Sequence, residues 1–109
     1  MSGLAQRSCS EAGAGTPCTP TQVATLLGEL PAGWEITEDG KALRKAFRFA
    51  DFHRTMSFVN ALAHEANRED HHPDLEVGYH YCNVRFSTHD AGGLTQKDFI
   101  CAARVDRLT

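Results

Sequence analysis

The sequence predicts an α+β domain, in which three helices pack on one face of a four-stranded antiparallel sheet. The chain has 109 residues, which suits a single domain. Three segments have apolar residues at helical spacing, and two segments between them have apolar and polar residues in alternation. The resulting order is helix, hairpin, helix, hairpin, helix. One helical layer on one antiparallel sheet is the simplest arrangement that buries every apolar face.

The composition is that of an ordinary folded domain, with 41% hydrophobic and 23% charged residues and a net charge of −3. A negative net charge argues against direct binding of nucleic acid, which needs a basic face. No apolar run is long enough to span a membrane, and the N-terminus lacks the apolar core of a signal peptide. We therefore expect a cytoplasmic protein without membrane contact.

Residues 1–18 are rich in Gly, Ala and Ser, and Leu4 is the one large apolar residue among them. We expect a flexible tail there and a folded domain over residues 19–109. The four cysteines are too few and too scattered for a disulfide scaffold, so we expect reduced thiols without a shared role. They are Cys9, Cys18, Cys82 and Cys101.

The first helix should cover about residues 20–30. Thr19, Pro20 and Gln22 form a capping-box pattern at its start, and Pro31 follows its end. Two short alternating runs follow, the second over 43–49, around an Asp-Gly turn at 39–40. This pattern is typical of a hairpin.

The second helix should begin after the cap residue Asp51 and run to about Asn67. A second hairpin is expected from alternating runs at 75–79 and 82–86, and a third helix from about 96 to 107, capped by Thr95. The expected apolar stripe of the second helix consists of Phe52, Met56, Val59, Ala63 and Ala66, widened by Leu62.

Histidine placement is the unusual feature of the chain. Of six histidines, four fall between positions 71 and 89. His71 and His72 follow the second helix, and Pro73 disfavours helical geometry at His72. His89 ends the last strand after Ser87 and Thr88, and in the predicted layout this strand end meets the exit of the second helix. Imidazoles titrate near neutral pH, so the three suit acid–base chemistry on a small polar heterocycle.

Other interpretations of these residues stand beside that one. Zinc binding is one alternative for the cluster, but adjacent histidines rarely share one ion and no spacing typical of zinc ligands is present. Asp98, at the third position of the last helix, is at least as well explained as a helix cap as by a supporting catalytic role. Trp34 fits either the core or the border of a flat ligand's pocket. We expect the remaining histidines, His53, His64 and His80, at the surface.

Three motifs together resemble one known family. Residues 69–74 read EDHHPD, 87–90 read STHD, and 93–98 read GLTQKD. With the Gly33-Trp34 pair and the stretch FRFADF at 47–52, this pattern resembles the pterin-4a-carbinolamine dehydratases over about residues 20–108. A His-His-Pro run alone is weak, but the three motifs at these spacings are specific.

The resemblance implies dehydration of 4a-hydroxytetrahydropterin to quinonoid dihydropterin, without a metal or a bound cofactor. His71 and His89 match the family's acid–base histidines and His72 a histidine that helps to bind the substrate. Trp34 matches an aromatic residue near the pocket mouth. The residues expected to contact the pterin are Asp70, Pro73, Ser87 and Thr88, with possible support from Asp98 and Asn67.

One position departs from the family pattern, because Asn67 stands where some members carry an acidic residue. We therefore do not carry over a charged contact there. The resemblance also implies a homodimer or homotetramer. It leaves open a role as dimerisation cofactor of a transcription factor, for which the second helix with Phe58, Ala61 and Leu62 would supply an apolar face. A zinc-binding module is the third alternative.

Overall fold

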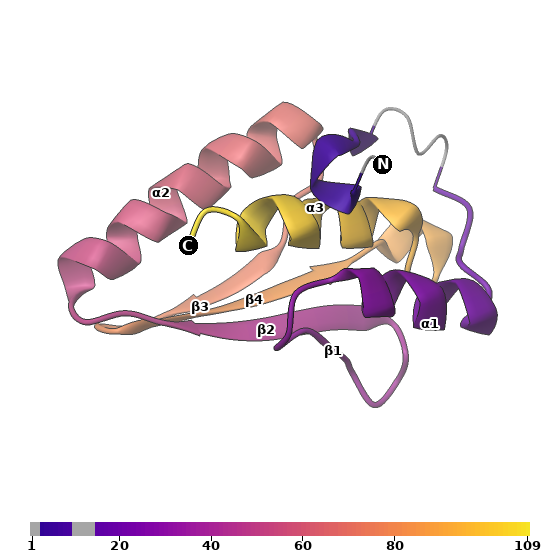
Figure 1. Ribbon diagram of the computed structural model, residues 1–109, viewed down its shortest axis with the longest axis horizontal. Helices are drawn as coiled ribbons and strands as arrows, with labels where there is room; N and C mark the ends of the chain where they lie inside the picture. The colour runs from indigo at the N-terminus through magenta and orange to yellow at the C-terminus, as the bar shows by residue number, and fades with distance from the viewer. Residues whose placement is uncertain (1–2, 10–14) are drawn as a thin grey trace.

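The computed structural model describes residues 3–9 and 15–109, and their fold is the predicted α+β arrangement (Figure 1). In the described residues, the short 3-10 helices η1 and η3 accompany three α-helices and four strands. In chain order the elements are η1 (Leu4–Gln6), α1 (Pro20–Glu29), β1 (Glu35–Ile36), β2 (Ala42–Arg48), α2 (Phe52–Glu69), β3 (Asp74–Val77), β4 (Tyr81–Ser87), η3 (His89–Ala91) and α3 (Gln96–Asp106).

The four strands form one antiparallel sheet in the order β1-β2-β4-β3. The two predicted hairpins are present, and they join through their second strands, β2 and β4. Along β4 the even-numbered residues Cys82, Val84 and Phe86 are at most 1% exposed and belong to the core, while their neighbours are half-buried. This is the period-2 pattern of a sheet with one covered face.

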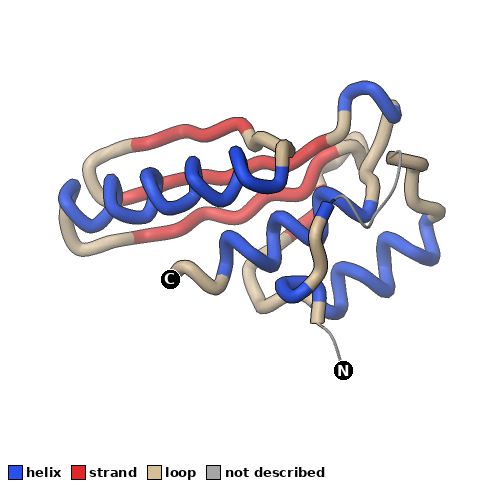
Figure 2. Tube along the Cα trace, turned by 90° about the horizontal axis from the view of Figure 1, so that it is seen from above, coloured by secondary structure: helices blue, strands red, loops and turns tan. Residues whose placement is uncertain are grey.

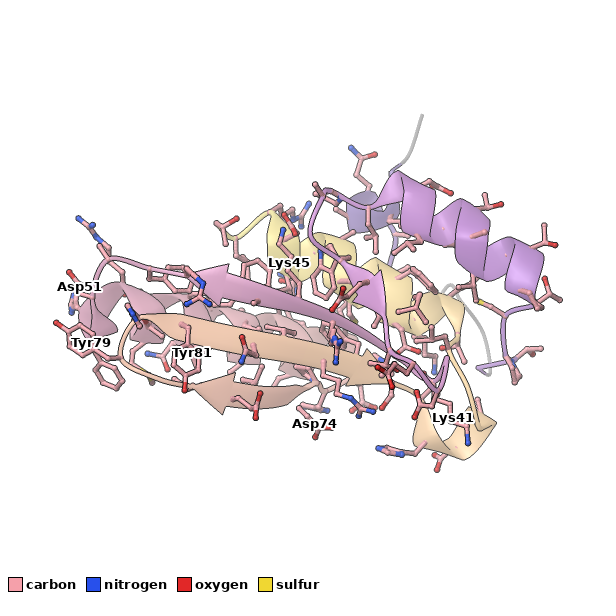
Figure 3. All side chains as sticks on the ribbon, turned by 90° about the horizontal axis from the view of Figure 1, so that it is seen from below. Lys41, Lys45, Asp51, Asp74, Tyr79 and Tyr81 are labelled. Atoms are coloured by element: carbon pink, nitrogen blue, oxygen red, sulfur yellow. The ribbon has the colours of Figure 1, made fainter. Side chains whose placement is uncertain are left out.

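Helices α2 and α3 lie on one face of the sheet, and α1 lies beside α3 (Figures 1 and 2). Figure 3 shows the opposite face of the sheet, which these helices leave uncovered. The predicted starts of all three helices are confirmed. In the capping box of α1, the Gln22 backbone N–H donates to the Thr19 hydroxyl, and the Thr19 N–H donates to the Gln22 side chain. The Asp51 carboxylate accepts from the Arg54 backbone N–H at 2.8 Å.

The predicted apolar stripe of α2 is confirmed only in part. Leu62 and Ala66 are buried as predicted, but Phe52 is 48% exposed, Ala63 is exposed, and Met56 and Val59 are only half-buried. Phe58, which was not part of the predicted stripe, is in the core. The expected partner-binding face with Phe58 and Leu62 is therefore not available at the surface. The reason is that two polar residues, Thr55 and Glu65, belong to the buried face and interrupt its apolar pattern.

Both buried polar side chains of α2 have partners. The Thr55 hydroxyl lies 2.9 Å from the carbonyl oxygens of both Asp51 and Tyr79, to which it can donate its hydrogen bond. Glu65 accepts from Arg104 of α3 at 2.7 Å. A polar group can replace an apolar one in a core when its hydrogen bonds are made, and this is why the pattern misleads.

Residues 3–9 lie in the segment expected to be a flexible tail, yet they pack against α3. Leu4 and Cys9 are 4% and 2% exposed and belong to the core. The Arg104 side chain donates to the Arg7 carbonyl oxygen at 2.7 Å. The described part of this segment is thus an integral part of the packing on α3, and residues 10–14 of the expected tail lie outside the described residues.

Candidate active site

The exit of α2 and the end of β4 lie side by side, as the sequence predicted. Because β3 pairs antiparallel with β4, Asp74 at the start of β3 lies opposite Arg85 near the end of β4. The chain leaves α2 through Asp70, whose φ of 51° places it in the left-handed region. This turn delivers His71 and His72 to the edge of the sheet at which β4 ends.

Asp98 is a fully buried carboxylate at the centre of a hydrogen-bond network. Its Oδ2 accepts from the Thr88 hydroxyl at 2.8 Å and from the Thr95 backbone N–H at 3.0 Å. Its Oδ1 lies 2.7 Å from Nε2 of His71. A buried carboxylate remains charged only when such partners compensate for lost hydration. Asp98 therefore caps α3 and also holds His71, so the two roles that the sequence left as alternatives coexist.

His71 is fixed in position and in tautomer by its surroundings. Its ring stacks on Phe86 with the centroids 6.0 Å apart and the planes 9° from parallel. Because the carboxylate of Asp98 only accepts, Nε2 of His71 must carry a proton. No described residue bonds to Nδ1, and 11% of the side chain stays exposed. Nδ1 is thus the atom at which His71 can exchange a proton with a bound molecule.

His72 contacts Asn67, the residue that departs from the family pattern. Its Nε2 is 2.9 Å from Oδ1 of Asn67, one turn before the end of α2, and both residues are exposed. An amide oxygen accepts this bond from an imidazole N–H as a carboxylate would, but without the charge. Asn67 thus contacts His72, and its supporting role in a site stays a prediction.

A pocket of about 190 Å³ lies where β4 passes into η3. His89 lies on its border and is exposed, with Ser87 and Thr88 beside it. Figure 3 shows Lys41 near the η3 turn. The remaining lining residues are Asp39, Lys41, Arg85, Gly92 and Gly93. Thr88 belongs both to this pocket and to the Asp98 network, so it connects His89 with His71.

Three other predicted site residues lie apart from this network. Trp34 is 7% exposed and packs against Phe47 and Phe86, and its indole N–H donates to Asp106 at 2.7 Å. It is a core residue, and its one link to the site is through Phe86. Asp70 is exposed at the end of α2, and Pro73 is half-buried between His72 and β3.

The residues of this region that sequence reasoning missed include Phe86, which supports the His71 ring, and the charged pocket residues Lys41 and Arg85. Phe86 carries a signal, because it lies on the inward face of a predicted strand directly before the Ser-Thr-His motif. Lys41 and Arg85 carry none, since exposed cations on a hairpin are ordinary. The predicted surface positions of His53, His64 and His80 are confirmed.

Two further observations concern residues 3–9 and 15–109 alone. Within these ranges, no three side chains of His, Cys, Asp or Glu are placed to hold a metal ion together. None of the helices formed by these residues is long and apolar enough to cross a membrane.

Comparison with known proteins decides the family. The model of the pterin 4 alpha carbinolamine dehydratase family matches residues 16–108. The chain belongs to this family. The match contains all three motifs from which the resemblance was recognised, and the network of His71, Asp98 and Thr88 joins those motifs in space.

Individual members of the family are similar over most of their length. A Legionella pneumophila strain Lens protein, provisionally named as a pterin-4-alpha-carbinolamine dehydratase, is 50% identical over 98% of this chain and 96% of its own. A protein of Stenotrophomonas maltophilia with the same provisional name is 59% identical over 81% of this chain and 75% of its own. A crystal structure of a transcriptional coactivator/pterin dehydratase from Brucella melitensis superposes with a TM-score of 0.81 at 27% identity, covering 85% of this chain and 98% of that one.

Proposed function

We propose that this protein dehydrates 4a-hydroxytetrahydropterin to quinonoid dihydropterin in the cytoplasm. The reaction would return the pterin cofactor of aromatic amino acid hydroxylases to its cycle. Family membership supports the reaction class. The observation that carries the proposal for this chain is the contact of His71 Nε2 with the buried Asp98 carboxylate at 2.7 Å, which leaves Nδ1 available.

The reaction needs two proton transfers. The 4a-hydroxyl leaves as water only after its oxygen is protonated, because hydroxide is a poor leaving group. The electron pair comes from a pterin nitrogen, which then loses its proton to a base. We assign these transfers to His71 and His89, and we assign substrate binding to His72 with Asp70 and the Ser87–Thr88 segment. The site needs neither a metal nor a bound cofactor for these steps.

The surroundings of the two histidines suit these roles. Asp98 holds the His71 ring in one orientation and stabilises its imidazolium form when it has accepted a proton. His89 is exposed at the pocket border, where it can exchange protons with solvent between turnovers. Acid–base assistance of this kind is worth about 10²–10⁴-fold in rate.

The test of the proposed activity is a stopped-flow assay with chemically generated 4a-hydroxytetrahydropterin. The purified protein should speed the loss of the 4a-hydroxy absorbance in proportion to its concentration. A heat-denatured sample of the same preparation is the control. A decay rate equal to the uncatalysed rate at every protein concentration would exclude the dehydratase function.

We also propose that the chain self-associates through the outer side of α2. Phe52 is 48% exposed, and Met56 and Val59 on the same side are half-buried, so an apolar stripe remains on the surface of this helix. Phe52 stacks with the ring of Tyr79, which is 66% exposed. Burial of such a stripe between copies is favourable by about 25 cal/mol per Å² of apolar surface.

A role in transcription is the second candidate function. It is favoured by the Brucella melitensis structure, whose name joins a transcriptional coactivator with a pterin dehydratase. The same α2 stripe would then accept a partner protein in place of a second copy. Size-exclusion chromatography with light scattering distinguishes the two, because a homo-oligomer forms from the pure protein alone.

A further inference from the structure

The N-terminal segment of residues 3–9 is fastened to α3 at several points. Leu4 is buried in the core. The Arg7 guanidinium donates to the Gln96 side chain at 2.6 Å, and its carbonyl oxygen accepts from Arg104 at 2.7 Å. Arg7 thus contacts residues near both ends of α3, through its side chain and its backbone.

The last described residue of this segment, Cys9, forms a contact with Cys101 of α3 that no pattern in the sequence predicts. The Sγ atoms of Cys9 and Cys101 are 3.2 Å apart, although the residues are 92 positions apart in the chain. Both residues are 2% exposed. The Cys9 backbone N–H also donates to Glu69 at 2.8 Å, which holds Cys9 against the end of α2. The two sulfurs are therefore kept in contact by bonds that do not depend on them.

The two thiols differ in chemical character. Either sulfur can donate in this contact. The hydrogen bond with Cys101 lowers the pKa of Cys9, as do the charges of Lys97 and Arg104, and this outweighs the opposing effects of burial and of Glu69. The same bond, together with burial, raises the pKa of Cys101. Cys9 is thus the sulfur that more readily becomes a thiolate, and a thiolate is the form that reacts with oxidants.

We propose that Cys9 and Cys101 form an oxidative modification site at which a small hydroperoxide closes a disulfide. The Cys9 thiolate attacks the peroxide, so that an S–O bond forms and the O–O bond breaks with release of water or an alcohol. The Cys101 sulfur then attacks the resulting sulfenic acid, forming the S–S bond and releasing water. The two thiols together lose two electrons and two protons, and the hydroperoxide is reduced.

The geometry requires little rearrangement for this step. A disulfide needs about 2.05 Å between the sulfurs, so the gap of 3.2 Å must close by roughly 1.1 Å. A hydroperoxide is small enough to reach a nearly buried pair, which a protein thiol is not. In a reducing compartment the bond would form only under oxidative conditions, as is usual for cytosolic disulfides.

The bond would join the N-terminal segment to α3 beside the candidate site. Cys101 lies one turn after Asp98 on α3, and Cys9 contacts Glu69, two residues before His71. Closing so long a loop restricts the unfolded chain strongly. We expect the melting temperature to rise by about 10 °C on oxidation, and to return to its starting value on reduction.

The test is oxidation of the purified full chain with hydrogen peroxide, after full reduction. The intact mass should fall by two hydrogen atoms, and peptide mapping without reduction should link the peptides of Cys9 and Cys101. The melting temperature is measured on the same samples. Neither readout depends on the dehydratase activity.

Substitution of each of the four cysteines in turn separates the proposed pair from the other two. Cys9→Ser and Cys101→Ala should lose both the mass change and the thermal shift, and Cys18→Ser and Cys82→Ala should keep both. If Cys101→Ala fails to fold, Cys9→Ser and the wild-type peptide map still decide. Four free thiols after treatment, a link between other cysteines, or an unchanged melting temperature in linked protein would each overturn the proposal.

Discussion

Asp98→Asn tests the assignment of His71 most sharply, because the substitution changes charge and proton position with little change of shape. The asparagine oxygen can still accept from Thr88 and the Thr95 N–H, which places its amide nitrogen 2.7 Å from Nε2 of His71. Two N–H donors cannot bond to each other. The imidazole must therefore move its proton to Nδ1, and the atom proposed to exchange a proton with the substrate changes from acceptor to donor.

The expected changes in kcat and in stability follow from the interactions that Asp98→Asn removes. Acid–base assistance is worth about 10²–10⁴-fold, so kcat for dehydration should fall by about 10²-fold or more. Asp98 is fully buried, and its replacement by a neutral amide removes the charge that strengthens its three hydrogen bonds. This loss of stability is partly offset, because a neutral group costs less to bury than a carboxylate. We expect a loss of about 1–2 kcal/mol in the free energy of unfolding.

Asp106→Asn is the matched control for this experiment. Asp106 lies on the same helix, accepts from Trp34 and pairs with Lys45, but does not contact His71. This variant should lose stability while kcat stays at the wild-type value. Stopped-flow dehydration and thermal unfolding are measured for both. A folded Asp98→Asn protein with kcat within about threefold of wild type would refute the proposed role of His71 and Asp98.

Four further predictions can be checked with the same assays or with simple reagents. His89→Ala should slow dehydration by about 10²-fold without a change in melting temperature, because the side chain is exposed. Thr88→Val should cost about 1–2 kcal/mol of stability, measured by urea unfolding, since it leaves Asp98 with one bond fewer. Val59→Glu should dissociate an oligomer seen by light scattering, and an unchanged mass would exclude the α2 stripe as its interface. Burial raises the pKa of Cys82 to about 11, so its thiol is neutral at pH 8 and should resist iodoacetamide in the native state; rapid alkylation would contradict its burial.

Much of the fold could be predicted because its signals are local. The caps at Thr19, Asp51 and Thr95 fix where the helices begin, and the alternation along β4 fixes which side faces the core. The buried face of α2 could not be predicted in the same way. Thr55 and Glu65 face inward because partners elsewhere in the chain satisfy them, and a pattern of apolar residues does not register such partners.

Some features of the candidate site could likewise be predicted from local signals, and others could not. The meeting of the His71 segment with the Thr88–His89 segment follows from antiparallel pairing of β3 with β4, so topology was enough to predict it. That Asp98 reaches His71 as well as its own helix cap depends on how α3 packs on the sheet. The contact of Cys9 with Cys101 has no local signal at all, since it joins a segment that resembles a tail to a helix 92 positions away.

The most direct test of the account compares His71→Ala with His64→Ala in single-turnover dehydration of 4a-hydroxytetrahydropterin. Both histidines lie in or just after α2, but His64 is exposed and makes none of the hydrogen bonds of the Asp98 network. The account predicts that His71→Ala slows the enzyme-dependent rate by at least about 10²-fold, while His64→Ala keeps the wild-type rate. A folded His71→Ala protein that dehydrates the substrate as fast as wild type would contradict it.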